Sequence, residues 1–281
     1  DNINSKDIRI GDIVFIERAG DVIPQITRVD IKKRENVQDF QYIKNCPSCN
    51  SDLIRREGEA AWRCINLKAC PAQNLEKIIH FVSKDAMDIN GLGKDIVKRF
   101  IESDFITNIP SIYQLDYEAI FNLEGWKEKS VENLKQGIEE SKSNEMHRLL
   151  IALGIDGVGT TMAKSLAKKV EHVLDFQSWT LEEFIALDDV GPKLAQSLFD
   201  FFHNEEQLGV LRKLEELGVN LKGVEQNTGG ALYGKTIVFT GFRNPDLEKK
   251  IESLGGEVAK SLSKKTSILI MKEKGSGSSK E

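Results

Sequence analysis

Four glycine-centred turns recur through the middle of the chain at almost constant spacing. They begin at positions 91, 125, 157 and 189, so the intervals are 34, 32 and 32 residues. A short apolar segment precedes each turn, and an amphipathic helix pattern follows it, as at Met162, Leu166 and Val170. A fixed period of this size indicates one helix-turn-helix unit used four times. The turns are Gly91-Leu92-Gly93, Gly125-Trp126-Lys127, Gly157-Val158-Gly159 and Asp189-Val190-Gly191.

A glycine turn that opens a helix can hold a phosphate. The first N–H groups of the helix have no partner within it, and the positive end of the helix dipole points outward. Lys94, Thr160 and Lys193 follow the first, third and fourth turns closely and fit such a role. The alternative is that any one of these turns is glycine-rich for steric reasons alone.

Two of the turns depart from the glycine pattern. Lys127 replaces the second glycine of its turn, where it suits a phosphate by charge but not a backbone with φ above zero. Asp189 replaces the first glycine of the fourth turn, and its carboxylate would repel a phosphate. We therefore expect the fourth copy to be mainly structural.

All four cysteines of the chain lie in one short window, in the pattern C-x2-C-x14-C-x5-C. Four thiolates at this spacing can close a tetrahedron around zinc, and a site with four sulfur ligands leaves no open position for catalysis. Reduced core cysteines or two disulfides are the alternatives. The predicted ligands are Cys46, Cys49, Cys64 and Cys70.

The segments before the cysteines are β-like. Apolar runs at Ile13–Ile16 and Val22–Ile26 flank a tight turn at Ala19-Gly20-Asp21. Two strands are not stable alone in water, so we expect them to be the end of a larger sheet.

The segments after the repeats predict a small α/β unit. Gln226–Gly230 has the composition of a linker. A buried strand at Thr236–Phe239 and a helix at Asp246–Leu254 follow, the helix ending at Gly255-Gly256 as at a C-terminal cap. A further β-type run covers Ser267–Ile270.

Composition limits the class of function. Of 281 residues, 39 are Lys or Arg and 44 are Asp or Glu, and the net charge of −5 excludes nucleic-acid binding by a general basic field. No apolar run reaches the roughly 18 residues of a membrane span, and the N-terminus lacks a secretory pattern. Walker-type loops and Ser-centred nucleophile elbows are absent.

Together, these features resemble the C-terminal half of the bacterial NAD-dependent DNA ligases over essentially the whole chain. The order of the matching segments also agrees with that family. They are 18–24 for the OB domain, 46–73 for the four-cysteine zinc finger, 80–93 for the first helix-hairpin-helix, and 234–241 with Gly255-Gly256 for a BRCT domain.

The resemblance implies a multidomain α+β chain. Its expected parts are the end of an OB domain with a connector (1–45), a zinc finger (46–73), an all-α helix-hairpin-helix domain with four hairpins (74–225), a linker (226–231) and the first part of a BRCT domain (232–281).

The resemblance also implies a function. The family seals nicks in duplex DNA, in replication and repair, through a lysine that takes AMP from NAD with the help of magnesium. That lysine sits in a Lys-x-Asp-Gly motif, which this chain lacks. We therefore expect catalytic and NAD-binding residues to lie upstream of Asp1, and this chain alone to be inactive in adenylation.

On this interpretation the chain is a cytoplasmic, nucleoid-associated monomer that clamps nicked duplex DNA without sequence preference and has no membrane partner. The alternative is a non-catalytic scaffold of DNA repair with a BRCT recruitment module. A Lys-x-Asp-Gly motif upstream would distinguish the two. The expected DNA-binding residues are Arg18, Val22, Gly91, Gly93, Lys94, Gly125, Lys127, Gly157, Gly159, Thr160, Gly191 and Lys193.

Overall fold

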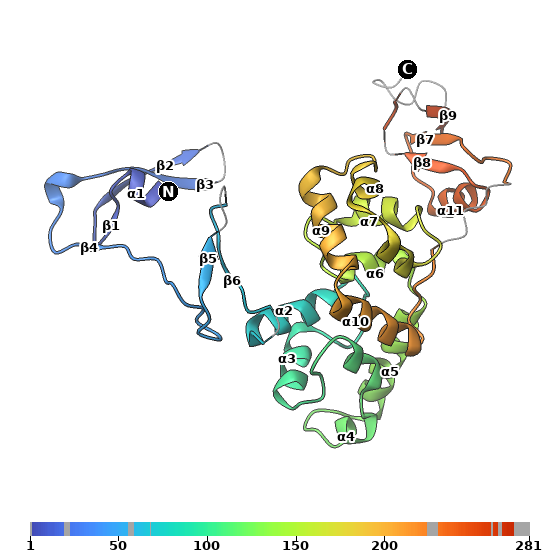
Figure 1. Ribbon diagram of the computed structural model, residues 1–281, viewed down its shortest axis with the longest axis horizontal. Helices are drawn as coiled ribbons and strands as arrows, with labels where there is room; N and C mark the ends of the chain where they lie inside the picture. Colours follow the sequence, from blue (N-terminus) through green and yellow to red (C-terminus); the bar gives the residue numbers. More distant parts are fainter. Residues whose placement is uncertain are drawn as a thin grey trace. The chain divides into compact units, whose positions relative to one another are not determined.

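The computed structural model describes residues 2–19, 23–55, 59–67, 69–223, 230–259, 261–263 and 266–272. The chain divides into two compact units, Asp1–Ile78 and Ile79–Glu281. Strands dominate the first unit and helices the second, with a small parallel sheet at the C-terminal end of the second (Figure 1). The expected mixed α+β class is confirmed.

The N-terminal unit begins with two pairs of antiparallel strands. α1 (Asn2–Ser5) precedes β1 (Arg9–Ile10), which pairs with β4 (Gln38–Asp39). β2 (Val14–Ala19) pairs with β3 (Ile23–Val29), and η1 (Ile31–Lys33) follows. The predicted strands are present; the turn between them, with Val22, lies outside the described residues. No closed barrel is formed by the strands that the structure describes.

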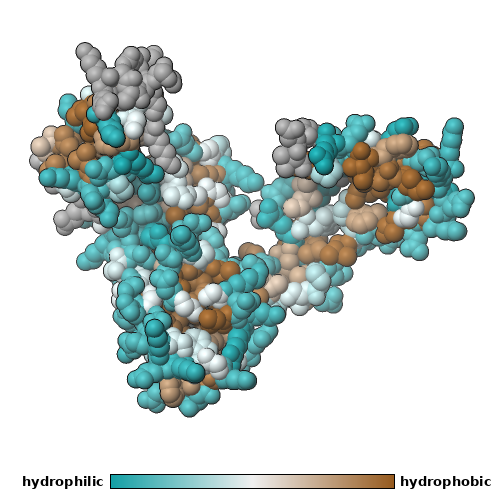
Figure 2. Space-filling model, turned by 180° about the vertical axis from the view of Figure 1, so that it is seen from behind, coloured by the Kyte–Doolittle hydropathy of each residue, from teal (hydrophilic) through white to brown (hydrophobic). Residues whose placement is uncertain are grey.

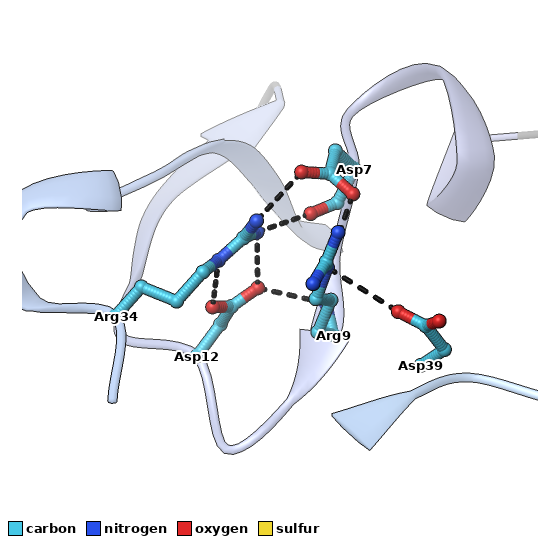
Figure 3. Close-up of polar contacts among 5 residues, drawn as sticks. All are labelled: Asp7, Arg9, Asp12, Arg34 and Asp39. Atoms are coloured by element: carbon cyan, nitrogen blue, oxygen red, sulfur yellow. Dashed lines mark hydrogen bonds and ion pairs between the residues drawn. The ribbon is translucent and has the colours of Figure 1, made fainter. Parts of the chain in front are cut away.

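Arg34 ties these strands together (Figure 3). Its Nε and Nη2 donate to the two carboxylate oxygens of Asp12 at 2.8 and 2.9 Å, and its Nη1 donates to Asp7 at 2.6 Å. The backbone N–H of Arg9 also donates to Asp12, at 2.7 Å. Because the Asp12 side chain is 1% exposed, this fork of charge-assisted bonds satisfies a buried carboxylate.

The β2–β3 hairpin leaves apolar side chains in solvent. Ile13, Phe15, Ile16 and Ile23 are 41% to 69% exposed, and Figure 2 shows such side chains gathered on the N-terminal unit. In this structure the hairpin therefore presents an apolar face to solvent.

The second unit is built from helix pairs. The first helix, α2 (Pro71–Val82), crosses the boundary between the two units. The pairs are α2 with α3 (Lys94–Glu102), α4 (Tyr117–Phe121) with α5 (Glu128–Lys142), α6 (Met146–Ala152) with α7 (Thr160–Ala167), and α8 (Leu181–Ile185) with α9 (Pro192–Phe202). Two 3-10 helices, η2 (Pro110–Gln114) and η3 (Val173–Ser178), and a last α-helix, α10 (Glu205–Glu216), complete the domain. The predicted four helix-turn-helix units are therefore present.

Aromatic side chains fill the core of this domain. Phe176, Phe184 and Phe202 are fully buried, with ring centroids 4.9 to 6.4 Å apart. In the first two pairs, Trp126 of the second turn stacks on Phe100 of α3 at 5.4 Å. These contacts fix the helix pairs and the turns between their helices.

Gly137 allows α5 to pass close to the first turn. A Cβ at this position would lie 2.3 Å from the carbonyl oxygen of Asn90, which is backbone and cannot swing away. A Cβ added to Gly91 would likewise lie 3.2 Å from the Cα of Leu134, on the same helix α5. The absence of a side chain at residue 137 therefore sets the distance between the first two helix pairs.

The C-terminal sheet has three parallel strands. β7 (Thr236–Thr240) lies between β8 (Glu257–Ala259) and β9 (Thr266–Met271), and α11 (Pro245–Ser253) connects β7 to β8. Gly255 has φ +82° and the N–H of Gly256 donates to the carbonyl of Ile251, so the predicted glycine cap is present. The short strand β8 was not predicted.

Within the described residues, every helix is too short or too polar to cross a bilayer.

Gly137→Ala should destabilise the helical domain. The added methyl group must push α5 away from the first turn, and overpacking of this kind costs about 1–3 kcal/mol. The matched control is Gly209→Ala in α10, where a Cβ would meet nothing within 4 Å; it should stabilise by about 0.5–1 kcal/mol. Urea denaturation of wild type and of both variants gives the change in the free energy of unfolding that each substitution causes. Equal effects would show that the close approach at residue 137 is unimportant.

The N-terminal unit should lose stability in acid. Hydrogen bonds from Arg34 lower the pKa of Asp12 and of Asp7 below the ordinary 3.8. The carboxylates therefore stabilise the fold above pH 3.8, and this contribution disappears as the pH falls through their lowered folded pKa values. In Arg34→Met we expect the pKa of Asp12 to rise, as measured by carboxyl ¹³C NMR. An unchanged Asp12 titration would contradict this role of Arg34.

Candidate metal centre and nucleic-acid interface

The structure brings the four cysteines together. Their sulfur atoms all lie within 4.8 Å of one another, with Cys46–Cys70 at 3.9 Å and Cys49–Cys64 at 3.5 Å. A tetrahedron of Zn–S bonds of about 2.3 Å has edges of about 3.8 Å, so the sulfur positions fit a zinc ion. All four thiols are free, which excludes the two-disulfide alternative for this structure.

Local backbone structure explains how the sulfurs converge. In the first knuckle, the N–H of Cys46 donates to Ser51 and the N–H of Asn50 donates back to Cys46, both at 2.8 Å. The hairpin of β5 (Leu53–Arg55) and β6 (Trp62–Cys64) then returns Cys64 to the knuckle. Cys70 stands directly before α2, whose first residue is a proline, as is common at helix starts.

Hydrogen bonds favour thiolates at two of the four positions. The hydroxyl and the N–H of Ser51 lower the pKa of Cys49 to about 6, and the N–H of Gln73 lowers the pKa of Cys70. Burial raises the pKa of Cys64 to about 11. Zinc binds thiolates only, so a metal at this site must displace the Cys64 proton.

The four glycine-centred turns share one backbone conformation. The middle residue of each donates its N–H to the residue three positions back, at 3.0 to 3.3 Å. The first residue of each turn has positive φ: +93° at Gly91, +85° at Gly125, +87° at Gly157 and +64° at Asp189. The residue with positive φ is the third of the four residues that this hydrogen bond closes, for example Gly91 in the β-turn 89–92. Type II β-turns require positive φ at that place, and Asp is among the few non-glycine residues that adopt it.

The third residue of each turn is the N-cap of the following helix. Gly93, Lys127, Gly159 and Gly191 are all extended, with φ between −67° and −138°. The concern that Lys127 is unsuited to φ above zero was therefore wrong, because the positive φ lies two residues earlier. Asp189, which stands where the other turns have glycine, also has positive φ, so the fourth turn keeps the backbone conformation of the other three.

Three of the N-caps leave open space at the start of a helix. A Cβ on Gly93, Gly159 or Gly191 would meet nothing within 4 Å, and none of the three has a side-chain hydrogen bond at its cap. A phosphate oxygen can approach such a helix start closely. Lys94, Thr160 and Lys193 each lie in the first turn of one of these helices.

The middle residues anchor the turns. Leu92, Val158 and Val190 are at most 9% exposed, and Trp126 stacks on Phe100. The first and second turns also border one cavity of about 440 Å³. Its lining residues are Gly91, Asp95, Ile96, Arg99, Gly125, Trp126, Ser130 and Asn133. The contribution of Arg99 to this lining was not predicted; its position one helical turn after Asp95 on α3 was the available signal.

The remaining predicted DNA-binding residues are Arg18 and Val22, of which Arg18 lies on β2. Arg18 pairs with Pro24 across the two strands. Val22 is outside the described residues.

Four family profiles match the chain. They are the NAD-dependent DNA ligase OB-fold domain over 1–38, the NAD-dependent DNA ligase C4 zinc finger domain over 45–72, the helix-hairpin-helix motif over 148–211, and the BRCA1 C Terminus (BRCT) domain over 227–281.

Curated relatives cover almost the whole chain. A DNA ligase of Sulfurihydrogenibium azorense is 46% identical over 97% of this chain and 40% of its own length. DNA ligases of Persephonella marina and Oceanobacillus iheyensis are 45% and 43% identical over 97% of this chain, covering 39% and 42% of theirs. The chain thus spans about 40% of the length of the relatives it matches.

Replacing one cysteine should remove the metal and unfold the segment around it. We expect Cys64→Ala to bind no zinc and to expose residues 46–70 to protease, because a segment this short depends on its metal for folding. Ile65→Ala, at an exposed neighbour (53%), is the control and should retain one zinc per chain. Elemental analysis and limited proteolysis measure both effects. Full zinc content in Cys64→Ala would refute the site.

Proposed function

We propose that this chain is part of an enzyme of the NAD-dependent DNA ligase family, and that it is the part that grips nicked duplex DNA. The observation that carries this proposal is the common geometry of the four turns. Three of them place an open helix start where a phosphate can be bound by backbone N–H groups.

Binding of this kind suits a nick sealer. Backbone N–H groups contact phosphates and carry no base information, so the grip is independent of sequence. Because the chain has a net charge of −5, affinity must come from these few positions, with Lys94, Lys127, Thr160 and Lys193 as neighbouring donors. The salt dependence should then correspond to a handful of displaced counterions.

The zinc finger and the β2–β3 hairpin would have supporting roles in DNA binding. Zinc, held by the four cysteines, would stabilise the connection between the strands of the first unit and the helices of the second. Arg18 and Val22 would contact the minor groove. The exposed apolar face of the β2–β3 hairpin would pack against further OB strands from the part of the enzyme that this chain does not span.

The bond chemistry would take place elsewhere in the enzyme. We propose that the adenylated lysine, NAD and magnesium belong to the portion of the relatives that this chain does not cover. The chain's own contribution is to hold the two DNA ends of the nick in place while the 3′-hydroxyl attacks the adenylated 5′-phosphate, which forms the phosphodiester bond and releases AMP. We further propose that it acts as a monomer in the cytoplasm, associated with the nucleoid through DNA.

Gly159→Val should weaken binding to nicked duplex DNA about tenfold, the loss of roughly one charge-assisted contact. Gly159 is extended at φ −93°, so valine leaves the turn unstrained. The new side chain instead occupies the space in which a phosphate would approach α7. A fluorescence-anisotropy titration at two salt concentrations measures the effect, with helix content checked by circular dichroism.

The matched variant is Asp189→Asn, which keeps a residue that tolerates positive φ and removes the charge. It should bind at least as tightly as wild type. If Gly159→Val folds and binds normally, the third turn is not a phosphate site. A loss of binding in Asp189→Asn would contradict the expected repulsion between the Asp189 carboxylate and a phosphate.

A further inference from the structure

An open groove of about 370 Å³ lies on the second helix pair of the helical unit. Its walls come from α4 and α5, which pack against each other (Figure 1). α4 contributes Tyr117, Glu118 and Phe121 to the lining, and α5 contributes Glu128, Val131 and Glu132. We call this feature the α4–α5 groove.

The apolar part of the groove includes an exposed aromatic ring. In the segment 79–223, which the structure describes completely, the exposed large apolar side chains are Phe121 and Ile185, at 52% and 43%. Fraying of α4 does not explain the exposure of Phe121, because Asp116 caps the start of this helix and the neighbouring Ile120 is fully buried. The fold therefore holds at the surface a kind of side chain that commonly anchors protein interfaces.

The carboxylates of the groove are unpaired among the residues that the structure describes. Within these residues, Glu118, Glu128 and Glu132 form no ion pair, and their side chains accept no hydrogen bond. Lys129 and Lys135 also lie on α5, yet in the described structure neither is paired with a carboxylate of the groove. The groove thus carries negative charge that the described part of the chain leaves uncompensated.

Helix stability accounts for two of these carboxylates but not for the third. Glu118 and Glu128 stand in the first turns of α4 and α5, where a negative charge interacts favourably with the helix dipole. Glu132 lies one turn further along α5, beyond the range of that effect. Its charge, next to Val131 in the lining, has no role in the helix itself.

The combination of apolar surface and unpaired carboxylates determines the chemistry of the occupant. Three glutamates repel a DNA phosphate, which excludes the groove from the proposed DNA grip. A lysine or arginine side chain fits both features, because its aliphatic stem covers apolar surface while its charged head reaches a carboxylate or the face of a ring. A basic protein segment supplies several such side chains at once.

We propose that the α4–α5 groove docks a basic segment of a partner protein. Basic side chains of this segment pair with Glu118, Glu128 and Glu132, and an apolar side chain packs on Phe121 and Val131. None of the residues at the three open helix starts lines the groove. The inference is therefore independent of the proposed DNA grip and adds a protein-binding surface to it.

The test uses the full, zinc-loaded chain and two synthetic peptides. The first consists of lysine, arginine and leucine, and in the second glutamate replaces every basic residue. Isothermal titration calorimetry measures their affinities, and backbone amide NMR locates the binding site. We expect only the basic peptide to bind, with the largest shifts on the amides of residues 117–122 and 128–132.

Two substitutions test the apolar and the charged parts of the groove separately. Phe121→Ala should weaken binding of the basic peptide at least about tenfold, as expected for loss of an aromatic anchor. Glu132→Gln should weaken it about threefold, the loss of one exposed ion pair. Both variants should bind nicked duplex DNA as wild type does.

The matched controls lie on α8, outside the groove. Ile185→Ala removes the other exposed large apolar side chain, and Glu182→Gln removes the same charge as Glu132→Gln. Both should bind the basic peptide as wild type does. Equal losses in these controls would show a general attraction between a positive peptide and a chain of net charge −5, which would overturn the proposal.

Three other outcomes would also overturn it. The first is failure of the basic peptide to bind, or equal binding of the acidic peptide. The second is loss of DNA binding in Phe121→Ala or Glu132→Gln, which would assign the groove to the DNA interface. The third is binding of spermidine as tightly as the basic peptide, with the same amide shifts, which would assign the groove to a small polyamine.

Discussion

The helical domain depends on one repeated backbone constraint, a residue with positive φ two positions before a helix N-cap. It reverses the chain within four residues and aims the start of the next helix outward. Glycine meets this constraint three times and Asp189 once, with the same result. The buried middle residue of each turn then fixes the turn to the core, so that a flexible sequence becomes a rigid site.

Most of this arrangement was predictable from the sequence, because period and turn chemistry are local. The cysteine spacing likewise led to a cluster with the sulfur separations of a zinc tetrahedron. Local sequence patterns could not show which residue of each turn has positive φ and which is extended. Lys127 was suspect until its φ of −138° showed that the third position is extended. The close passage of Gly137 over Asn90 joins residues 47 positions apart and has no local signal.

In the N-terminal unit, too, contacts between residues far apart in the sequence could not be predicted from local patterns. Arg34 belongs to a run of basic residues that looks like ordinary solvated surface, yet it satisfies a carboxylate that is almost completely buried. Its partners lie 22 and 27 positions earlier in the chain. The contact between the Trp62 and Tyr42 rings has a similar origin, since the two residues meet only because the hairpin of the zinc finger folds back along the segment before Cys46.

We propose that the helix starts after the turns make the DNA contacts. Backbone amide NMR of the zinc-loaded chain, titrated with fully paired nicked duplex, tests it directly. We expect the largest shifts on the amides of residues 94–96, 160–162 and 193–195. The proposal would be contradicted by shifts concentrated on other surfaces, such as α10 or the C-terminal sheet, while these helix starts remain unperturbed.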